Sequence, residues 1–181
     1  VQPASQNDPL LVIQIEKREV YVGEVVPITV TVYAPDRRVA IQRIGLIEVP
    51  KDNFAIQRFP LQPEQTIVSM GGVRYRAYVF RSTVSALRSG KFKLGPATSE
   101  ILFEVEARGS AGGGMQHPFF TQMEQRTARP QSADIEMTVL PLPELGRPPG
   151  FKGLVGDFDI SINAEPHELS VGDPISVEMT I

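Results

Sequence analysis

Side chains alternate between apolar and polar along most of the chain, and this period of two limits its fold more than any other feature. Successive side chains of a β-strand point to opposite faces, so such alternation is typical of strands with one buried face. Turn-forming Gly, Pro and Asp residues separate the runs. We therefore expect an all-β fold, an immunoglobulin-like antiparallel β-sandwich. The clearest runs lie at residues 11–15, 26–32, 73–80, 92–94, 101–105 and 135–139.

Three further segments have less regular patterns. Residues 39–49 are predicted to form another strand, and residues 85–90 a loop or a single helical turn. Residues 108–131 lack a strand pattern and include a Gly-rich stretch, which predicts a long loop between two strands. Loops of this length are usually functional or disordered.

A stretch near the beginning of the chain is repeated near its end. Residues 22–32 align without gaps on residues 171–181, sharing a Val-Gly-acid turn and four alternate apolar positions. Each copy predicts a strand, a glycine turn and a second strand. Upstream, two pairs of isoleucines continue the match, Ile13 with Ile160 and Ile15 with Ile162.

The repeat and a Pro-rich segment set the predicted domain boundaries. Residues 1–140 form the first sandwich, and residues 141–150 form a semi-rigid linker. Residues 151–181 begin a second, truncated β-sandwich, because two strands cannot bury a core of their own. We expect the natural protein to continue beyond residue 181, and a stop codon directly after that residue would contradict this expectation.

Composition excludes several classes of function. Among 181 residues there is no cysteine and there are two histidines, which excludes thiol nucleophiles, disulfides and sites built from several histidines. The net charge of -3 leaves no basic excess for binding nucleic acid. No apolar run reaches the length of a membrane-spanning helix.

No motif predicts catalysis, a cofactor or a metal site. His117 and His167 fall in predicted loops, away from any nucleophile motif. Asp157, Asp159 and Asp173 lack the spacing of a calcium loop and fit a solvent-facing strand and a turn. We therefore predict a protein that is not an enzyme. On the predicted strand at 73–80, Arg74 and Arg76 share a face and are expected to pair with carboxylates across the sheet.

The long loop supplies the candidate partner-binding residues, Met115, Phe119, Phe120 and Met123. Aromatic and methionine side chains are typical anchors of protein contacts. Alternatively, Phe119 and Phe120 close the open end of the sandwich. Replacing both phenylalanines by alanine separates the two hypotheses, because a plug predicts a loss of thermal stability and a docking site predicts lost partner capture.

Several segments, taken in order, resemble the BatD (aerotolerance) family of bacterial envelope proteins. They begin with Tyr21-Val-Gly-Glu-Val-Val-Pro-Ile-Thr-Val and continue with Leu87-Arg-Ser-Gly-Lys-Phe-Lys-Leu-Gly-Pro96, after Arg74-Tyr-Arg76. A Gly-rich insertion then ends in Pro118-Phe-Phe120, where His117 replaces an aspartate that is frequent in the family. The most specific segment runs from Leu140 through Gly-Arg-Pro-Pro-Gly150 to Val-Gly-Asp-Phe158.

The resemblance implies tandem immunoglobulin-like domains on the periplasmic face of the inner membrane, anchored by a segment outside this chain. It also implies a link to oxygen tolerance through von Willebrand A-domain membrane proteins and a MoxR-type ATPase. We expect a non-catalytic protein-interaction module. The alternatives are a carbohydrate-binding β-sandwich, disfavoured by the absence of Trp and the presence of only four Tyr, and a spacer.

Overall fold

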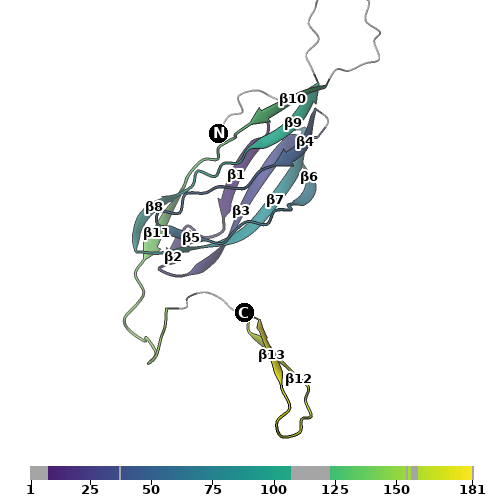
Figure 1. Cartoon of the computed structure of the whole chain (residues 1–181). Helices are drawn as coiled ribbons and strands as arrows, with labels where there is room; N and C mark the ends of the chain where they lie inside the picture. Colours follow the sequence, from purple (N-terminus) through teal and green to yellow (C-terminus); the bar gives the residue numbers. More distant parts are fainter. Residues whose placement is uncertain (1–7, 37, 107–122, 154, 156–158, 181) are drawn as a thin grey trace, which may run out of the picture.

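The computed structural model describes residues 8–36, 38–106, 123–153, 155 and 159–180, and all regular secondary structure in these ranges is strand (Figure 1). The strands are β1 (Leu10–Ile15), β2 (Glu19–Tyr21), β3 (Val25–Pro35), β4 (Val39–Ile44), β5 (Phe54–Ile56), β6 (Glu64–Met70), β7 (Val73–Ala86), β8 (Gly90–Leu94), β9 (Ile101–Glu106), β10 (Met123–Ala128), β11 (Ile135–Leu140), β12 (Ser161–Glu165) and β13 (Ser176–Thr180).

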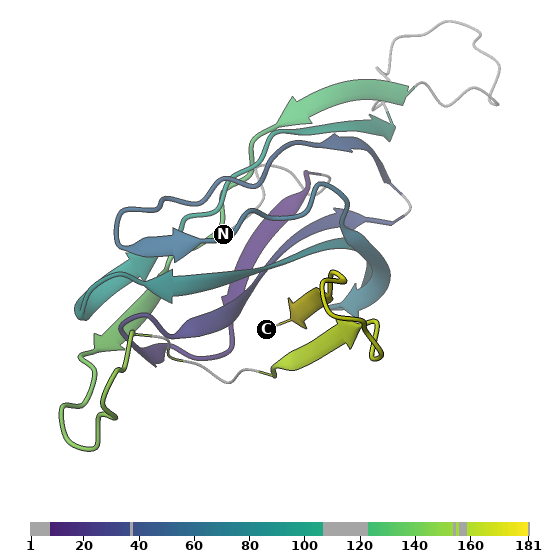
Figure 2. The same cartoon turned by 60° about the horizontal axis from the view of Figure 1, so that its bottom comes forward.

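The first sheet has the order β1-β3-β7-β5, and β6 also pairs with β7. All of its pairs are antiparallel. The strands β3 and β7 form its centre and pair over eleven positions, from Val25 opposite Ser85 to Pro35 opposite Tyr75 (Figure 2). Alternation places Val26, Ile28 and Val30 on the buried face of β3, as the sequence predicts.

The second layer is a bent sheet in two parts. One part has the order β4-β9-β10 and the other the order β8-β11-β2. The chain passes from one part to the other twice, because β8 leads into β9 and β10 leads into β11. Between the two parts, Thr98 forms isolated β-bridges with Glu48 and Gln131. The pairing of β2 with β11 is parallel, with Val20 opposite Val139.

The core lies between the two layers and confirms the predicted fold. A strand order of β1-β3-β7-β5 on one sheet, with β4, the β8–β9 strand and the β10–β11 strand on the other, is the arrangement of an immunoglobulin-like sandwich. Both sheets contribute side chains that are almost fully buried, among them Leu11, Ile28, Val30, Val84, Leu94, Ile101, Phe103 and Met137.

Several predicted boundaries are wrong. Strand β7 continues to Ala86, and the predicted loop is confirmed only at residues 87–89, which form a bend and no helical turn. Strand β4 ends at Ile44, well before the predicted end of that strand at residue 49. Residues 123–128, predicted as loop, form β10 because their backbone pairs with β9 from Met123 opposite Glu106 to Ala128 opposite Ile101.

The turns of the predicted repeat make the same two hydrogen bonds in both copies. Glu24 donates its amide to the carbonyl of Tyr21 at 3.1 Å, and its carboxylate accepts the Tyr21 amide at 2.8 Å. Asp173 makes the same two hydrogen bonds with Ser170, at 3.0 and 2.9 Å. Both turns place a glycine at the third position with positive φ, as a type II turn requires.

Strand pairing corrects the upstream part of the repeat. Ile13 lies opposite Val30 in the first copy, and Ile162 lies opposite Met179 in the second. Ile162 therefore corresponds to Ile13 rather than to Ile15, because the turn and both strands then match without a gap. The sequence match was displaced by two residues, a shift that preserves alternation and so leaves the apolar pattern unchanged.

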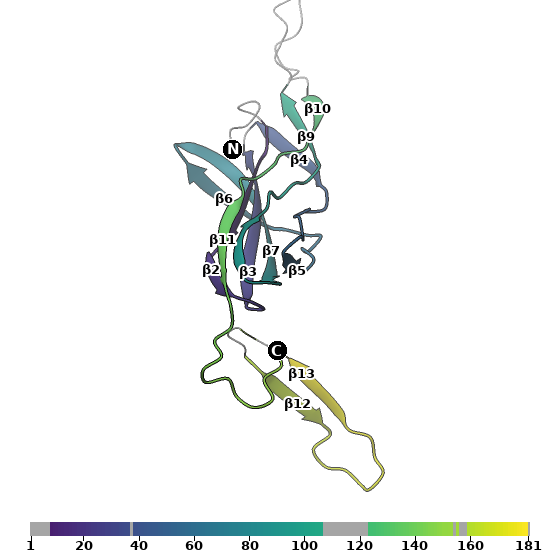
Figure 3. The ribbon, with the colours of Figure 1, turned by 90° about the vertical axis from the view of Figure 1, so that its left-hand side faces the viewer.

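The two copies differ in what covers them. Ile28 and Val30 of β3 have no exposed surface, whereas their counterparts Val177 and Met179 in β13 are 61% and 58% exposed. Figures 1 and 3 show β12 and β13 as a hairpin outside the sandwich. That this hairpin begins a second sandwich stays a prediction.

The linker at residues 141–150 runs from β11 as an exposed loop (Figure 2). Gly153 and Val155, which follow it, return to the first turn of the repeat. The amide of Val25 donates to the carbonyl of Val155 at 3.1 Å. A side chain added at Gly23 would place its Cβ 3.2 Å from the carbonyl oxygen of Gly153. The turn therefore has two reasons to require glycine, its φ of 78° and this close approach.

Replacing Gly23 by alanine is expected to lower the free energy of unfolding by about 1–2 kcal/mol, the cost of a left-handed residue with a Cβ. Chemical denaturation of the full chain measures the loss. The matched control is Gly72→Ala, because Gly72, in the turn between β6 and β7 of the same sandwich, has a φ of 79° but no described atom within 4 Å of the added Cβ. Equal losses in the two variants would show that the close approach to Gly153 does not add to the loss of unfolding free energy.

Candidate binding groove

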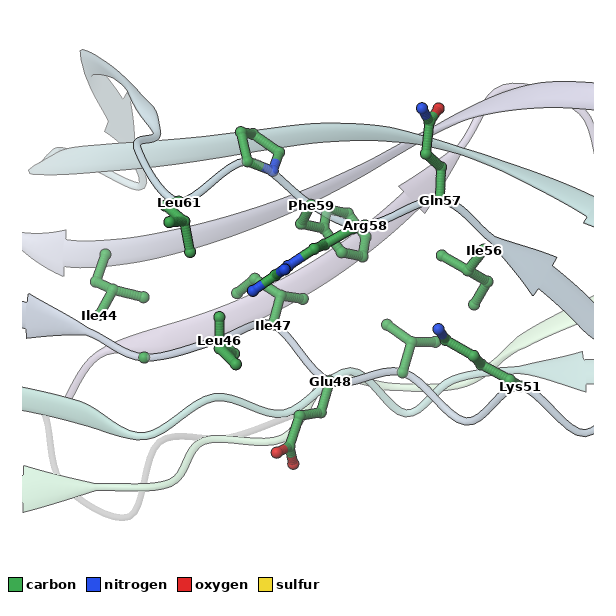
Figure 4. Close-up of a pocket in the computed structure, with 13 residues that line it drawn as sticks. Ile44, Leu46, Ile47, Glu48, Lys51, Ile56, Gln57, Arg58, Phe59 and Leu61 are labelled. Carbon is green, nitrogen blue, oxygen red and sulfur yellow. The ribbon is translucent and has the colours of Figure 1, made fainter.

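An open groove of about 600 Å³ lies along one side of the sandwich, between residues 44–51 and residues 56–61 (Figure 4). The first segment follows β4 and the second follows β5. These strands lie at the edges of the two different sheets. The groove therefore occupies the open side of the sandwich, where one layer ends opposite the other.

Hydrogen bonds to the neighbouring strands hold both walls in place. On the β4 side, the Gly45 amide donates to the Glu100 carbonyl at 2.7 Å, and Glu48 and Thr98 exchange two backbone bonds of 2.9 Å. On the β5 side, the Gln57 amide donates to the Thr83 carbonyl at 3.0 Å. The groove is thus bounded by backbone that is tied to the sheets, as a preformed binding site requires.

The side chains that line the groove are mainly apolar, and their exposure increases from the floor to the mouth. Val49 and Phe59 are buried, and Ile47 is half-buried against the core. At the mouth, Leu46 is 57% exposed and Leu61 is 70% exposed. Two exposed leucines on opposite walls above an apolar floor are suited to receive apolar side chains of another molecule.

Two cations, Lys51 and Arg58, also line the groove (Figure 4). Neither side chain forms an ion pair or hydrogen bond with another residue in the described part of the chain. The carboxylate of Glu48, the acidic residue of the lining, is bound by Nη2 of Arg129 at 2.7 Å. The groove is therefore apolar with a cationic rim, which favours a ligand that carries a carboxylate.

The residues predicted for partner binding are placed only in part. Met115, Phe119 and Phe120 lie outside the described residues. Met123 is the first residue of β10 and is 48% exposed. Sequence reasoning missed the groove altogether. Leu46 lies in the less regular strand predicted at residues 39–49 and Leu61 in a segment without a strand pattern, and only the fold brings them to opposite walls.

The residues of the histidine and carboxylate sites that the sequence disfavours are described only in part. His167, Asp159 and Asp173 are exposed, whereas His117 and Asp157 lie outside the described residues. Within the described ranges, no group of three or more His, Asp or Glu side chains is placed to hold a metal ion. The same ranges contain no helix with the length and apolarity to span a membrane.

The predicted pairing of the β7 arginines is confirmed. Arg74 and Arg76 both contact the carboxylate of Asp36, at 3.4 and 3.1 Å. Asp36 follows β3, the neighbour of β7 in the sheet, so the contact crosses strands. These arginines therefore serve as ion-pair partners of a single carboxylate, and exposed pairs of this kind add little to stability.

No family model matches the chain, and a search of curated proteins finds no significant match. A functional proposal consequently depends on the fold, the groove and the motifs of the sequence itself.

Proposed function

We propose that this chain is a non-catalytic protein-interaction module that receives an extended segment of a partner protein in the groove between residues 44–51 and 56–61. The observation that carries the proposal is the combination of exposed leucines on both walls with two cations at the rim that form no ion pair with a described residue. An apolar anchor and a complementary charge are the two contributions that fix a peptide in a surface groove.

The shape of the groove favours a polypeptide over a small molecule. It is open along its length, and its walls are the continuations of two edge strands. Phe59, the aromatic residue of the lining, is only 7% exposed and presents little ring surface for stacking on a sugar. A partner segment with apolar residues and an acidic residue fits the groove better than a carbohydrate.

The resemblance to BatD proteins gives this proposal its cellular setting. In that setting the module faces the periplasm and is anchored in the inner membrane by a segment outside this chain. Its partners are von Willebrand A-domain membrane proteins that act with a MoxR-type ATPase, and the assembly contributes to oxygen tolerance. The loop with Met115, Phe119, Phe120 and Met123 is a second contact region in the same proposal.

Replacing Leu61 by aspartate is expected to weaken capture of the von Willebrand A-domain partner by at least about tenfold, since a charge replaces an apolar anchor. The measurement is a pull-down with the full chain, quantified over a series of partner concentrations. Because Leu61 is 70% exposed, the melting temperature is expected to stay close to that of the original protein.

The matched control is Leu145→Asp, because Leu145 is 97% exposed and lies in the linker, outside the groove. Equal capture by the original protein and by Leu61→Asp would contradict the groove as the binding site. Failure of the original protein to capture any von Willebrand A-domain protein would contradict the assigned partner class.

A further inference from the structure

Strand β6 and the paired start of β7 project sideways from the sandwich as a two-stranded ribbon (Figure 3). All β6 residues except Val68 are exposed, and Ile67 and Met70 are 51% and 41% exposed. On its other side β6 has no strand partner and no backbone hydrogen bond to a described residue. Its outer amides and carbonyls are therefore available for another strand.

The edge of β6 lacks the features that normally prevent pairing between exposed strands. Its sequence, Glu-Gln-Thr-Ile-Val-Ser-Met, contains no lysine, arginine, proline or bulge, and it favours extended structure in the middle. Glu64, its single charged residue, lies at the end and is paired with Arg81. The inner five residues are thus uncharged.

The remaining described edges of the sandwich are better protected. Strand β10 carries Glu124 and Arg126, and β8 carries Lys91 and Lys93. Strand β4 has a bulge between Ile41 and Arg43. The strands β2 and β5 have three residues each. Strand β1 has one face in the core and is followed directly by the charged residues 16–18. Strand β6 is therefore the edge of the sandwich that is most open to strand addition.

One face of the ribbon is apolar. Val68 lies opposite Tyr75 and Met70 lies opposite Val73, so these four side chains share a face. The ring of Tyr75 meets that of Tyr33 edge-on, with centroids 6.5 Å apart, which continues the same face onto β3. A second β6 strand added at this edge would continue the face with mostly uncharged side chains.

We propose that two copies of this chain pair through β6, antiparallel about a two-fold axis at Ile67. This register places Ile67 opposite its own copy, Thr66 opposite Val68, Gln65 opposite Ser69, and Glu64 opposite Met70. No like charges meet, and the β-branched residues face one another in the centre, which stabilises antiparallel pairs. The inference goes beyond the proposed function, because it concerns self-association through the outer edge of β6, which begins at Glu64, after the last groove residue, Leu61.

The absence of cysteine makes a direct test possible, because a single introduced cysteine has no other thiol to pair with. In the proposed register, Ile67→Cys places two thiols on directly opposed residues, at a Cα separation that a disulfide accepts. We expect a disulfide-linked dimer of the full chain under mild oxidation. Glu124→Cys, on the β10 edge, is the matched control and is expected to form far less of it.

Sedimentation of the full chain over a range of concentrations measures the association without a crosslink. Ile67→Lys is expected to raise the dimer dissociation constant by about tenfold or more, because two like charges then face each other. Ile67→Thr keeps a β-branched, neutral residue and is expected to retain most of the association. Ile67 is half exposed, so both variants are expected to fold.

The apolar hairpin of β12 and β13 is the rival surface for self-association, and Val177→Lys tests it. A dimer that dissociates with Val177→Lys but persists with Ile67→Lys would overturn the proposal. A chain that stays monomeric at all concentrations, or a dimer in which Ile67→Cys forms no disulfide, would overturn it as well. A dimer that is weakened by Ile67→Lys and captured by Ile67→Cys supports it.

Discussion

Replacing Ile28 by alanine is expected to lower the free energy of unfolding by about 2–5 kcal/mol, the usual range for truncating a buried isoleucine. Ile28 has no exposed surface and lies in the central strand of the first sheet, opposite Ile15 on one side and Ser82 on the other. Truncation leaves a cavity between the two sheets that the surrounding strands cannot fill. Urea denaturation at equilibrium measures the loss.

The repeat provides a control with the same local structure. Val177 corresponds to Ile28, in a strand after the same kind of turn, but it is 61% exposed. Val177→Ala is expected to change the stability of the sandwich by less than about 0.5 kcal/mol, as is usual for exposed positions. A large loss in this variant would show that β13 is packed in solution against something that covers it.

Replacing Glu24 by alanine is expected to cost about 1.5–3 kcal/mol, the range for hydrogen bonds to a charged group. Glu24 is 8% exposed, accepts the Tyr21 amide at 2.8 Å and is paired with Nζ of Lys17 at 3.1 Å. The alanine variant leaves the Tyr21 amide without its acceptor. Thermal or chemical denaturation at neutral pH measures the effect, and Asp173→Ala in the exposed second turn is the matched control.

The contribution of Glu24 is also expected to depend on pH. The hydrogen bond from the Tyr21 amide, and then the bond and charge of Lys17, hold the pKa of Glu24 below its ordinary value of 4.5 against the opposing effect of burial. A lowered pKa in the folded state means that the stabilisation is complete above pH 4.5 and is lost as the pH falls through the lower folded value. The difference between the original protein and Glu24→Ala should therefore shrink on acidification from pH 5, and a constant difference would contradict this role.

The strands that alternation identified are those with one face in the core. In β3, for example, Val26, Ile28 and Val30 face the core while the residues between them are more exposed, so burial itself imposes the pattern. Strands β6 and β10 lack such a face. All β10 residues up to Thr127 are exposed, and its sequence Met-Glu-Gln-Arg-Thr-Ala holds no alternation, because its position depends on hydrogen bonds to β9 rather than on burial.

The groove could not be predicted from the sequence either, because it too depends on contacts between segments rather than on a local pattern. Leu46 and Leu61 belong to two separate segments, which continue the edges of two different sheets. Nothing local in the sequence indicates that these segments face each other, since that depends on how the sheets stack. The two turns of the repeat could be predicted from the sequence. In each, the glycine, Gly23 or Gly172, and the acid that follows it belong to a single four-residue turn, so the interactions that form the turn are local.

The parallel pairing of β2 with β11 bears on how the sandwich would respond to tension along the chain. The two strands run in the same direction and are joined by bonds such as those from the Thr138 amide to the Arg18 carbonyl, at 2.8 Å, and from the Val22 amide to the Leu140 carbonyl, at 3.0 Å. Once β1 has separated from β3, pulling the chain ends apart draws β2 and β11 in opposite directions along their common axis. The bonds between them are then loaded in shear and resist together, whereas an antiparallel hairpin pulled at its open end would open one bond at a time.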